Sequence, residues 1–113
     1  MSQITTHVLD TSKGAPAKGI KITLQRPKGE NQWEDITSGI TNADGRIANF
    51  LSDDIIIQPG VYRMLFDTKS YFEASNTKAF YPFVPIVFEI FDTEHYHIPL
   101  LLNPFGYSTY RGS

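Results

Sequence analysis

The last nineteen residues of the chain, positions 95–113, read HYHIPLLLNPFGYSTYRGS. If residues 95–102 form a strand, its period-two alternation gathers four apolar side chains on one face, those of Tyr96, Ile98, Leu100 and Leu102. The other face carries the imidazoles of His95 and His97, which must face solvent, a partner subunit or a site. Residues 103–106, Asn-Pro-Phe-Gly, are typical of a turn. We therefore predict that residues 107–111 return as a second strand beside the first.

The rest of the chain repeats this short alternating pattern. In residues 4–9 and 20–26, apolar and polar side chains alternate as in half-buried strands. His7 lies on the face opposite to that of Ile4, Thr6 and Val8. Further strands are predicted at 33–40, 61–66 and 86–91. Two prolines at the start of the last one indicate either an edge strand or a strand entrance. Residues 10–19 and 27–31 are expected as a loop and a turn, and residues 67–75 as a short helix capped by Asp67 or Thr68. About eight short strands with one helix predict an all-β, two-sheet sandwich.

The strongest internal turn signal is Asp44-Gly45, because glycine tolerates the positive φ of a tight bend. This turn presents Arg46 directly after the bend.

Size and composition fit one folded domain. With 113 residues, 41% hydrophobic and only 19% charged, the chain can build a single modest core and is not typical of disorder. We predict one domain spanning residues 1–113. The net charge of -2, without a basic run, disfavours nucleic acid or an anionic membrane as a partner.

The sequence contains no cysteine, which excludes disulfides, thiolate metal sites and a cysteine nucleophile. The first residues, MSQITTH, lack the basic segment and apolar run of a signal peptide. No apolar stretch reaches the roughly 18 residues that a bilayer span requires. We therefore expect a soluble, cytoplasmic protein.

Five segments match a known family: TTHVLD at 5–10, GAPA at 14–17, TNADGR at 41–46, HYHIPLLL at 95–102 and YSTYRGS at 107–113. Together they resemble the 5-hydroxyisourate hydrolases, the transthyretin-like enzymes of urate breakdown. The similarity runs from residue 4 to residue 113. Its most specific part is the terminal Tyr-Arg-Gly-Ser, which separates the hydrolases from the transthyretin carriers that share their fold.

The resemblance implies a two-sheet sandwich with one short helix, in agreement with the strand pattern. It also implies a homotetramer, a dimer of dimers, with active sites in the channel where the dimers meet, and a reaction that needs neither metal nor cofactor. By resemblance, the catalytic residues are His7, Arg46, His97 and Ser113. The substrate-binding residues implied in the same way are Tyr110, Arg111 and Gly112.

The implied reaction is hydrolytic opening of a cyclic amide in 5-hydroxyisourate, giving 2-oxo-4-hydroxy-4-carboxy-5-ureidoimidazoline. Water loses a proton as it attacks the carbonyl, and the leaving ring nitrogen gains one. The imidazoles of His7 and His97 suit these transfers because an unperturbed histidine has a pKa of about 6.5; which of them is the base stays open. Arg46 and Arg111 offer planar charged donors to ring oxygens and to a developing oxyanion. We interpret Ser113 as a hydrogen-bonding group and not as a nucleophile.

These side chains also have simpler interpretations. An outward histidine on a strand, or an arginine after a turn, is usually a solvated surface residue. His95 and His97 form a His-x-His pair that binds zinc only with further ligands, and the lack of cysteine disfavours such a site.

Two other function classes compete with the hydrolase. One is a transthyretin-like carrier that binds a small aromatic ligand in the tetramer channel, and the other is a structural sandwich used in protein contacts. A passive apolar channel has no need of two imidazoles and two guanidinium groups. The sequence therefore favours the enzyme.

Overall fold

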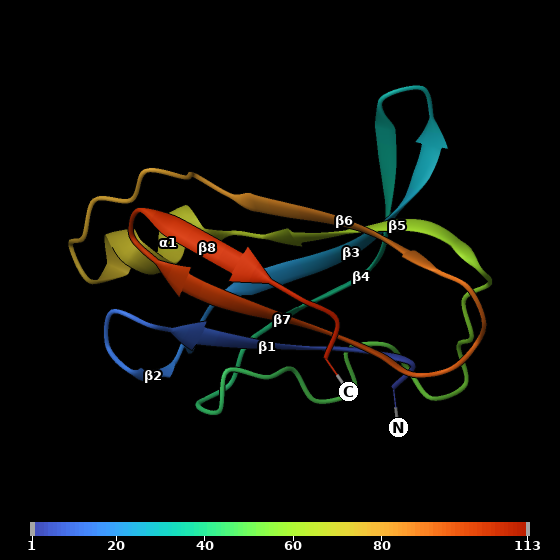
Figure 1. Cartoon of the computed structure of the whole chain (residues 1–113), viewed down its shortest axis with the longest axis horizontal. Helices are drawn as coiled ribbons and strands as arrows, with labels where there is room; N and C mark the ends of the chain where they lie inside the picture. Colours follow the sequence, from blue (N-terminus) through green and yellow to red (C-terminus); the bar gives the residue numbers. More distant parts are fainter. Residues whose placement is uncertain (1, 113) are drawn as a thin grey trace.

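The computed structural model describes residues 2–112, and these form two four-stranded sheets packed face to face (Figure 1). One sheet has the strand order β2-β1-β7-β8 and the other β4-β3-β5-β6. The elements in chain order are β1 (Ile4–Asp10), β2 (Ala15–Pro16), β3 (Lys21–Gly29), β4 (Gln32–Ile40), β5 (Gly60–Phe66), α1 (Thr68–Ala74), β6 (Val84–Ile90), β7 (Tyr96–Asn103) and β8 (Gly106–Thr109). The predicted two-sheet sandwich is confirmed.

Strand β7 supplies the core residues that its alternation predicts. The four apolar side chains of its inner face are all buried, namely Tyr96, Ile98, Leu100 and Leu102. They belong to one core cluster with side chains of the opposite sheet such as Met64 and Phe66. On the outer side, His97 is half-buried and His95, just before the strand, is exposed. The packing of β7 therefore leaves both imidazoles available on the outside of the sandwich.

Strand β1 runs parallel to β7, with Thr5 opposite His97 and His7 opposite Pro99. The buried side chains of β1 are those of its inner face, Ile4, Thr6, Val8 and Asp10. Because successive side chains of a strand point to opposite faces, Thr5 and His7 lie on the outer face. The prediction that His7 faces away from the core is confirmed.

Helix α1 closes one end of the sandwich between β5 and β6 (Figure 1). Asp67 is its N-cap and accepts a hydrogen bond from the backbone N–H of Ser70, as predicted. Phe72 is buried on the core side of the helix. Tyr71 donates a hydrogen bond of 2.7 Å from its hydroxyl to the buried carboxylate of Asp10, which ties the helix to the end of β1.

The structure corrects two predictions in the first half of the chain. Residues 10–19, expected as a loop, contain the short strand β2, in which Ala15 pairs with Asp10. The turn expected at 27–31 is tighter, because β3 continues to Gly29 and Asn31 adopts a positive φ of 57°. A register shift between Pro27 and Gly29 lets the proline remain in the hairpin, whose tip projects from the sandwich (Figure 1).

The last strand is also shorter than predicted. Strand β8 ends at Thr109 and not at residue 111. The chain then pairs again through Gly112, which forms an isolated antiparallel bridge with His97. Strand β6 is an edge strand of its sheet, which is one of the two interpretations that the prolines at its start allowed.

Among residues 2–112, no helix has the length and apolar character needed to cross a membrane.

Candidate active site

The turn after β4 places Arg46 beside His7 on the outer side of β1. Arg46 forms an isolated antiparallel bridge with His7, and the N–H of Val8 donates to the Gly45 carbonyl at 2.9 Å. Gly45 adopts a φ of +74°, and a Cβ there would lie 2.4 Å from the Val8 carbonyl oxygen and 3.3 Å from His7 Cδ2. Glycine is therefore required at this position, and the predicted Asp44-Gly45 turn fixes Arg46 next to His7.

A neighbouring hydroxyl orients the His97 ring. Thr5 lies opposite His97 in the parallel register, and its Oγ1 is 2.8 Å from His97 Nδ1. The same oxygen is 2.8 Å from His95 Nε2, and the two rings are stacked with their centroids 6.5 Å apart. Because Nδ1 of His97 is engaged, Nε2 is the nitrogen left to act on a bound molecule.

The end of the chain packs against the other side of the His97 ring. The N–H of Gly112 donates to the His97 carbonyl at 2.8 Å. A Cβ at Gly112 would lie 2.6 Å from His97 Cδ2 and 3.2 Å from Cγ. The tail and the ring therefore approach each other as closely as glycine allows.

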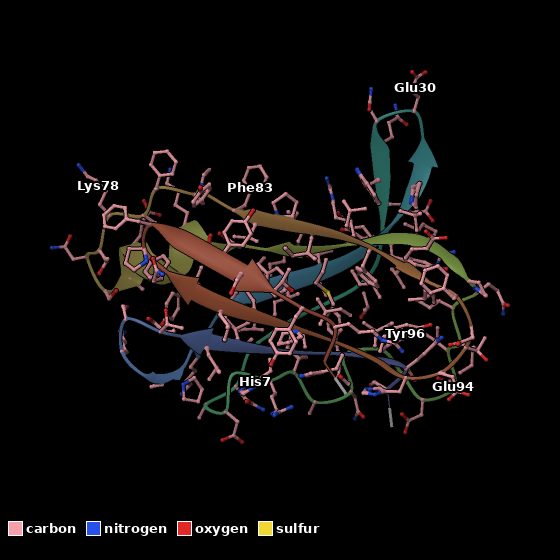
Figure 2. The ribbon with its side chains drawn as sticks, viewed as in Figure 1. His7, Glu30, Lys78, Phe83, Glu94 and Tyr96 are labelled. Carbon is pink, nitrogen blue, oxygen red and sulfur yellow. The ribbon has the colours of Figure 1, made fainter. Side chains whose placement is uncertain are left out.

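Electrostatic interactions join His7, Arg46 and His97 into one cluster. Burial lowers the pKa of His97 below its ordinary 6.5, and repulsion from Arg46, His7 and His95 lowers it further. Burial and the Arg46 charge also lower the pKa of His7, against the opposite effect of a hydrogen bond to the Asp44 backbone and of the Asp44 charge. Both rings are therefore neutral near pH 7, the form that can accept a proton. Figure 2 shows His7 beside β1.

Two of the predicted substrate-binding residues lie apart from this cluster within one chain. Because Gly112 pairs with His97, alternation directs the preceding Arg111 to the opposite face. Its guanidinium lies over the Tyr96 ring, 4.4 Å from the centroid. Arg111 and Tyr110 line a cavity of about 240 Å³ between the edge strands.

The remaining predicted site residue, Ser113, lies outside the described residues.

Thr5 was not among the predicted site residues. Its position two residues before His7 places it on the same outer face, and this signal was readable. The parallel pairing of β1 with β7, which places Thr5 opposite His97, could not be predicted from the sequence. His95 was expected to face solvent, a partner subunit or a site, and was also considered as half of a zinc-binding pair; in the structure its Nε2 is 2.8 Å from the Thr5 hydroxyl. Within residues 2–112, no three His, Cys, Asp or Glu side chains gather where a metal ion could be held.

Comparison with known proteins gives consistent relatives. The 5-hydroxyisourate hydrolase of Mus musculus is 44% identical over 114 aligned residues, which cover 99% of this chain and 96% of that protein. The solved structure of Klebsiella pneumoniae 5-hydroxyisourate hydrolase is 36% identical, with a TM-score of 0.85, and covers 100% of this chain and 94% of its own. The solved structure of transthyretin from Sparus aurata is 31% identical, with a TM-score of 0.90. The match covers 99% of this chain and 97% of that one.

The fold is thus a transthyretin-like β-sandwich, here carrying a histidine–arginine cluster on the outer face of one sheet. The sequence profile of the HIUase/Transthyretin family matches residues 4–112. The chain belongs to this family.

Proposed function

We propose that this chain hydrolyses 5-hydroxyisourate to 2-oxo-4-hydroxy-4-carboxy-5-ureidoimidazoline in the breakdown of urate. The observation that carries the proposal is the cluster of two neutral imidazoles and a guanidinium, His7, His97 and Arg46, fixed side by side by backbone bridges and by Thr5. Such a cluster suits proton transfer and oxyanion stabilisation, whereas a passive binding channel has no need of it. The hydrolase names of relatives such as the mouse protein, at 44% identity over nearly the whole chain, support the enzyme over the carrier.

His97 is the general base in this proposal. Its Nδ1 lies within hydrogen-bonding distance of Thr5, and its lowered pKa keeps the ring neutral near pH 7. In the tautomer with the proton on Nδ1, Nε2 carries the free lone pair. Nε2 therefore takes a proton from the attacking water. The electron pair of the broken C–N bond goes to the leaving ring nitrogen, which receives the proton that His97 has taken from the water.

Arg46 stabilises the charge that develops on the carbonyl oxygen. Its guanidinium is permanently charged and offers a planar set of donors. Its position at the outer face of β1 is fixed by the Gly45 turn, so the donors need little reorganisation during the reaction.

The tail contributes in two ways. Gly112 packs against the His97 ring and limits its movement. Tyr110, Arg111 and Ser113 contact the substrate, Arg111 by donating to oxygens of the urate-like ring. Since Arg111 lies on the Tyr96 side within one chain, this role requires that assembly or substrate binding bring its guanidinium to a site.

We further propose that the chain forms a homotetramer, a dimer of dimers, with the sites where the dimers meet. Strands β6 and β8 are edge strands, and edges present unpaired backbone groups that a second copy can pair with. Near these edges large apolar side chains are exposed, among them Val87 at 59% and Phe91 at 72%. Clustered exposure of this kind is typical of an interaction surface.

The proposal includes a cytoplasmic location, as expected for a chain stabilised by packing without disulfides.

The experiment generates 5-hydroxyisourate in situ from urate and urate oxidase and follows its ultraviolet band with and without this protein. Decay faster than the spontaneous rate, in proportion to protein concentration, is the expected result. A folded tetramer that leaves the spontaneous rate unchanged but binds a small aromatic ligand in a calorimetric titration would instead establish the carrier.

A further inference from the structure

We propose that Thr5 and His95 are positioning residues for His97: the Thr5 hydroxyl, shared between two imidazoles, fixes which nitrogen of His97 carries the proton. The inference rests on the proposed function, because it concerns the same site. It adds two residues to which neither the family resemblance nor the relatives' names assign a role.

The geometry of the shared hydroxyl carries the argument. Oγ1 of Thr5 is 2.8 Å from Nδ1 of His97 and 2.8 Å from Nε2 of His95. A threonine hydroxyl has one proton and two lone pairs, so it can donate to only one of the two rings; in the arrangement that we propose it accepts from the other. The two hydrogen bonds therefore run in one direction along the chain of groups, and the proton positions on the two rings are linked.

One direction makes His97 a base. In that arrangement His97 Nδ1–H donates to Thr5, and the Thr5 hydroxyl donates to His95 Nε2. Nε2 of His97 then keeps its lone pair and can accept a proton from water. The reverse direction places the proton on His97 Nε2 and removes the base.

His95 selects the direction. Its ring is exposed to solvent, whereas His97 is half-buried. A neutral His95 accepts the Thr5 proton at Nε2 and supports the base form of His97. A His95 that instead donates to Thr5 from Nε2, with the Thr5 hydroxyl donating to His97 Nδ1, leaves the proton of His97 on Nε2.

The charged and titratable groups around His97 all favour its neutral form. Arg46 from the turn after β4, His7 from β1 and His95 all act to lower the pKa of the His97 ring. A protonated His95 and a protonated His97 therefore oppose each other.

The first test replaces the hydroxyl. Thr5→Val keeps the β-branched shape and removes both hydrogen bonds, so we expect kcat to fall about 10–100-fold with KM within about threefold of wild type. Thr5→Ser restores the hydroxyl and should recover most of kcat. Thr11→Val, which removes an exposed hydroxyl bonded to Leu102 at the far end of β1, is the matched control and should have wild-type kcat. Equal kcat in Thr5→Val and wild type, or no recovery in Thr5→Ser, overturns the proposal.

The second test replaces the His95 ring. His95→Phe removes the Nε2 acceptor that lies 2.8 Å from the Thr5 hydroxyl, so we expect kcat to fall about 3–10-fold with KM within about threefold of wild type. His95→Gln keeps an acceptor at the position of Nε2 and should recover most of kcat. Wild-type kcat in His95→Phe, or an equal loss in both variants, would contradict the role of His95.

The third readout needs no substrate. Long-range ¹H–¹⁵N spectra of the histidine rings should show His97 protonated on Nδ1 in the wild-type protein and a shift of the proton toward Nε2 in Thr5→Val. If the protein does not hydrolyse 5-hydroxyisourate, the proposed function fails while these spectra still decide the hydrogen-bond arrangement. A wild-type His97 protonated on Nε2 would refute the arrangement even in an active enzyme.

Discussion

Gly112→Ala tests whether the tail holds the His97 ring in place. The added Cβ would lie 2.6 Å from His97 Cδ2, well inside ordinary carbon–carbon contact. Relief of the clash requires the ring or the tail to move by about 0.8 Å, since non-bonded carbons approach to roughly 3.4 Å at the closest. A misplacement of about 1 Å in a catalytic group costs on the order of 10²-fold in rate. We therefore expect kcat to fall about 30–100-fold.

Stability should change little in the same variant. Residue 112 lies near the chain end, and its bridge to His97 contributes about 1 kcal/mol at most. The matched control is Gly106→Ala, where the new Cβ would meet only Asn103 atoms at 3.8 Å, an ordinary contact. The assay is decay of enzymatically generated 5-hydroxyisourate, with thermal unfolding measured in parallel. Wild-type kcat in Gly112→Ala, or an equal loss in Gly106→Ala, would refute the reasoning.

Three further predictions address the tail, the fold and the pH dependence. Deletion of residues 111–113 should leave the circular dichroism spectrum unchanged and reduce turnover at least tenfold, because it removes Arg111 and the support of His97; full activity would exclude a role for the tail. Tyr71→Phe removes a hydrogen bond to the buried Asp10 carboxylate, so the free energy of unfolding, measured in urea near pH 7, should fall by about 1.5–3 kcal/mol. A loss of less than about 0.5 kcal/mol would show that water replaces the hydroxyl. Since the pKa values of both His7 and His97 are lowered, the neutral rings persist below pH 6.5, and the acid limb of kcat/KM should have its midpoint below that value; a midpoint above 6.5 would contradict the arrangement.

Most of the fold could be predicted from the sequence because apolar and polar side chains alternate cleanly along its strands. In β7 the apolar side chains at every second position are all buried, and the prediction from residues 95–102 is confirmed. Pairing between distant strands was not readable, because alternation fixes the faces of a strand but not its neighbour. The short strand β2 escaped prediction since its two residues, Ala15 and Pro16, carry no alternation.

For the site, the sequence named candidates but not their arrangement. The outward face of His7 and the turn before Arg46 followed from local rules, and the structure brings both to His97. The position of Arg111 over Tyr96 did not follow, because it depends on the return of the tail to pair with β7. The family resemblance is confirmed, whereas the roles given to individual site residues stay predictions.

The most direct measurement is the decay of 5-hydroxyisourate, generated from urate by urate oxidase, in the presence of wild-type protein and of His97→Asn. We predict that wild type accelerates the decay well beyond the spontaneous rate. His97→Asn should keep the fold and the assembly of wild type, by circular dichroism and size-exclusion chromatography, yet lose at least 100-fold in kcat, as expected when a general base is removed. A folded His97→Asn protein with wild-type turnover would contradict the central claim that His97 is the base of this site.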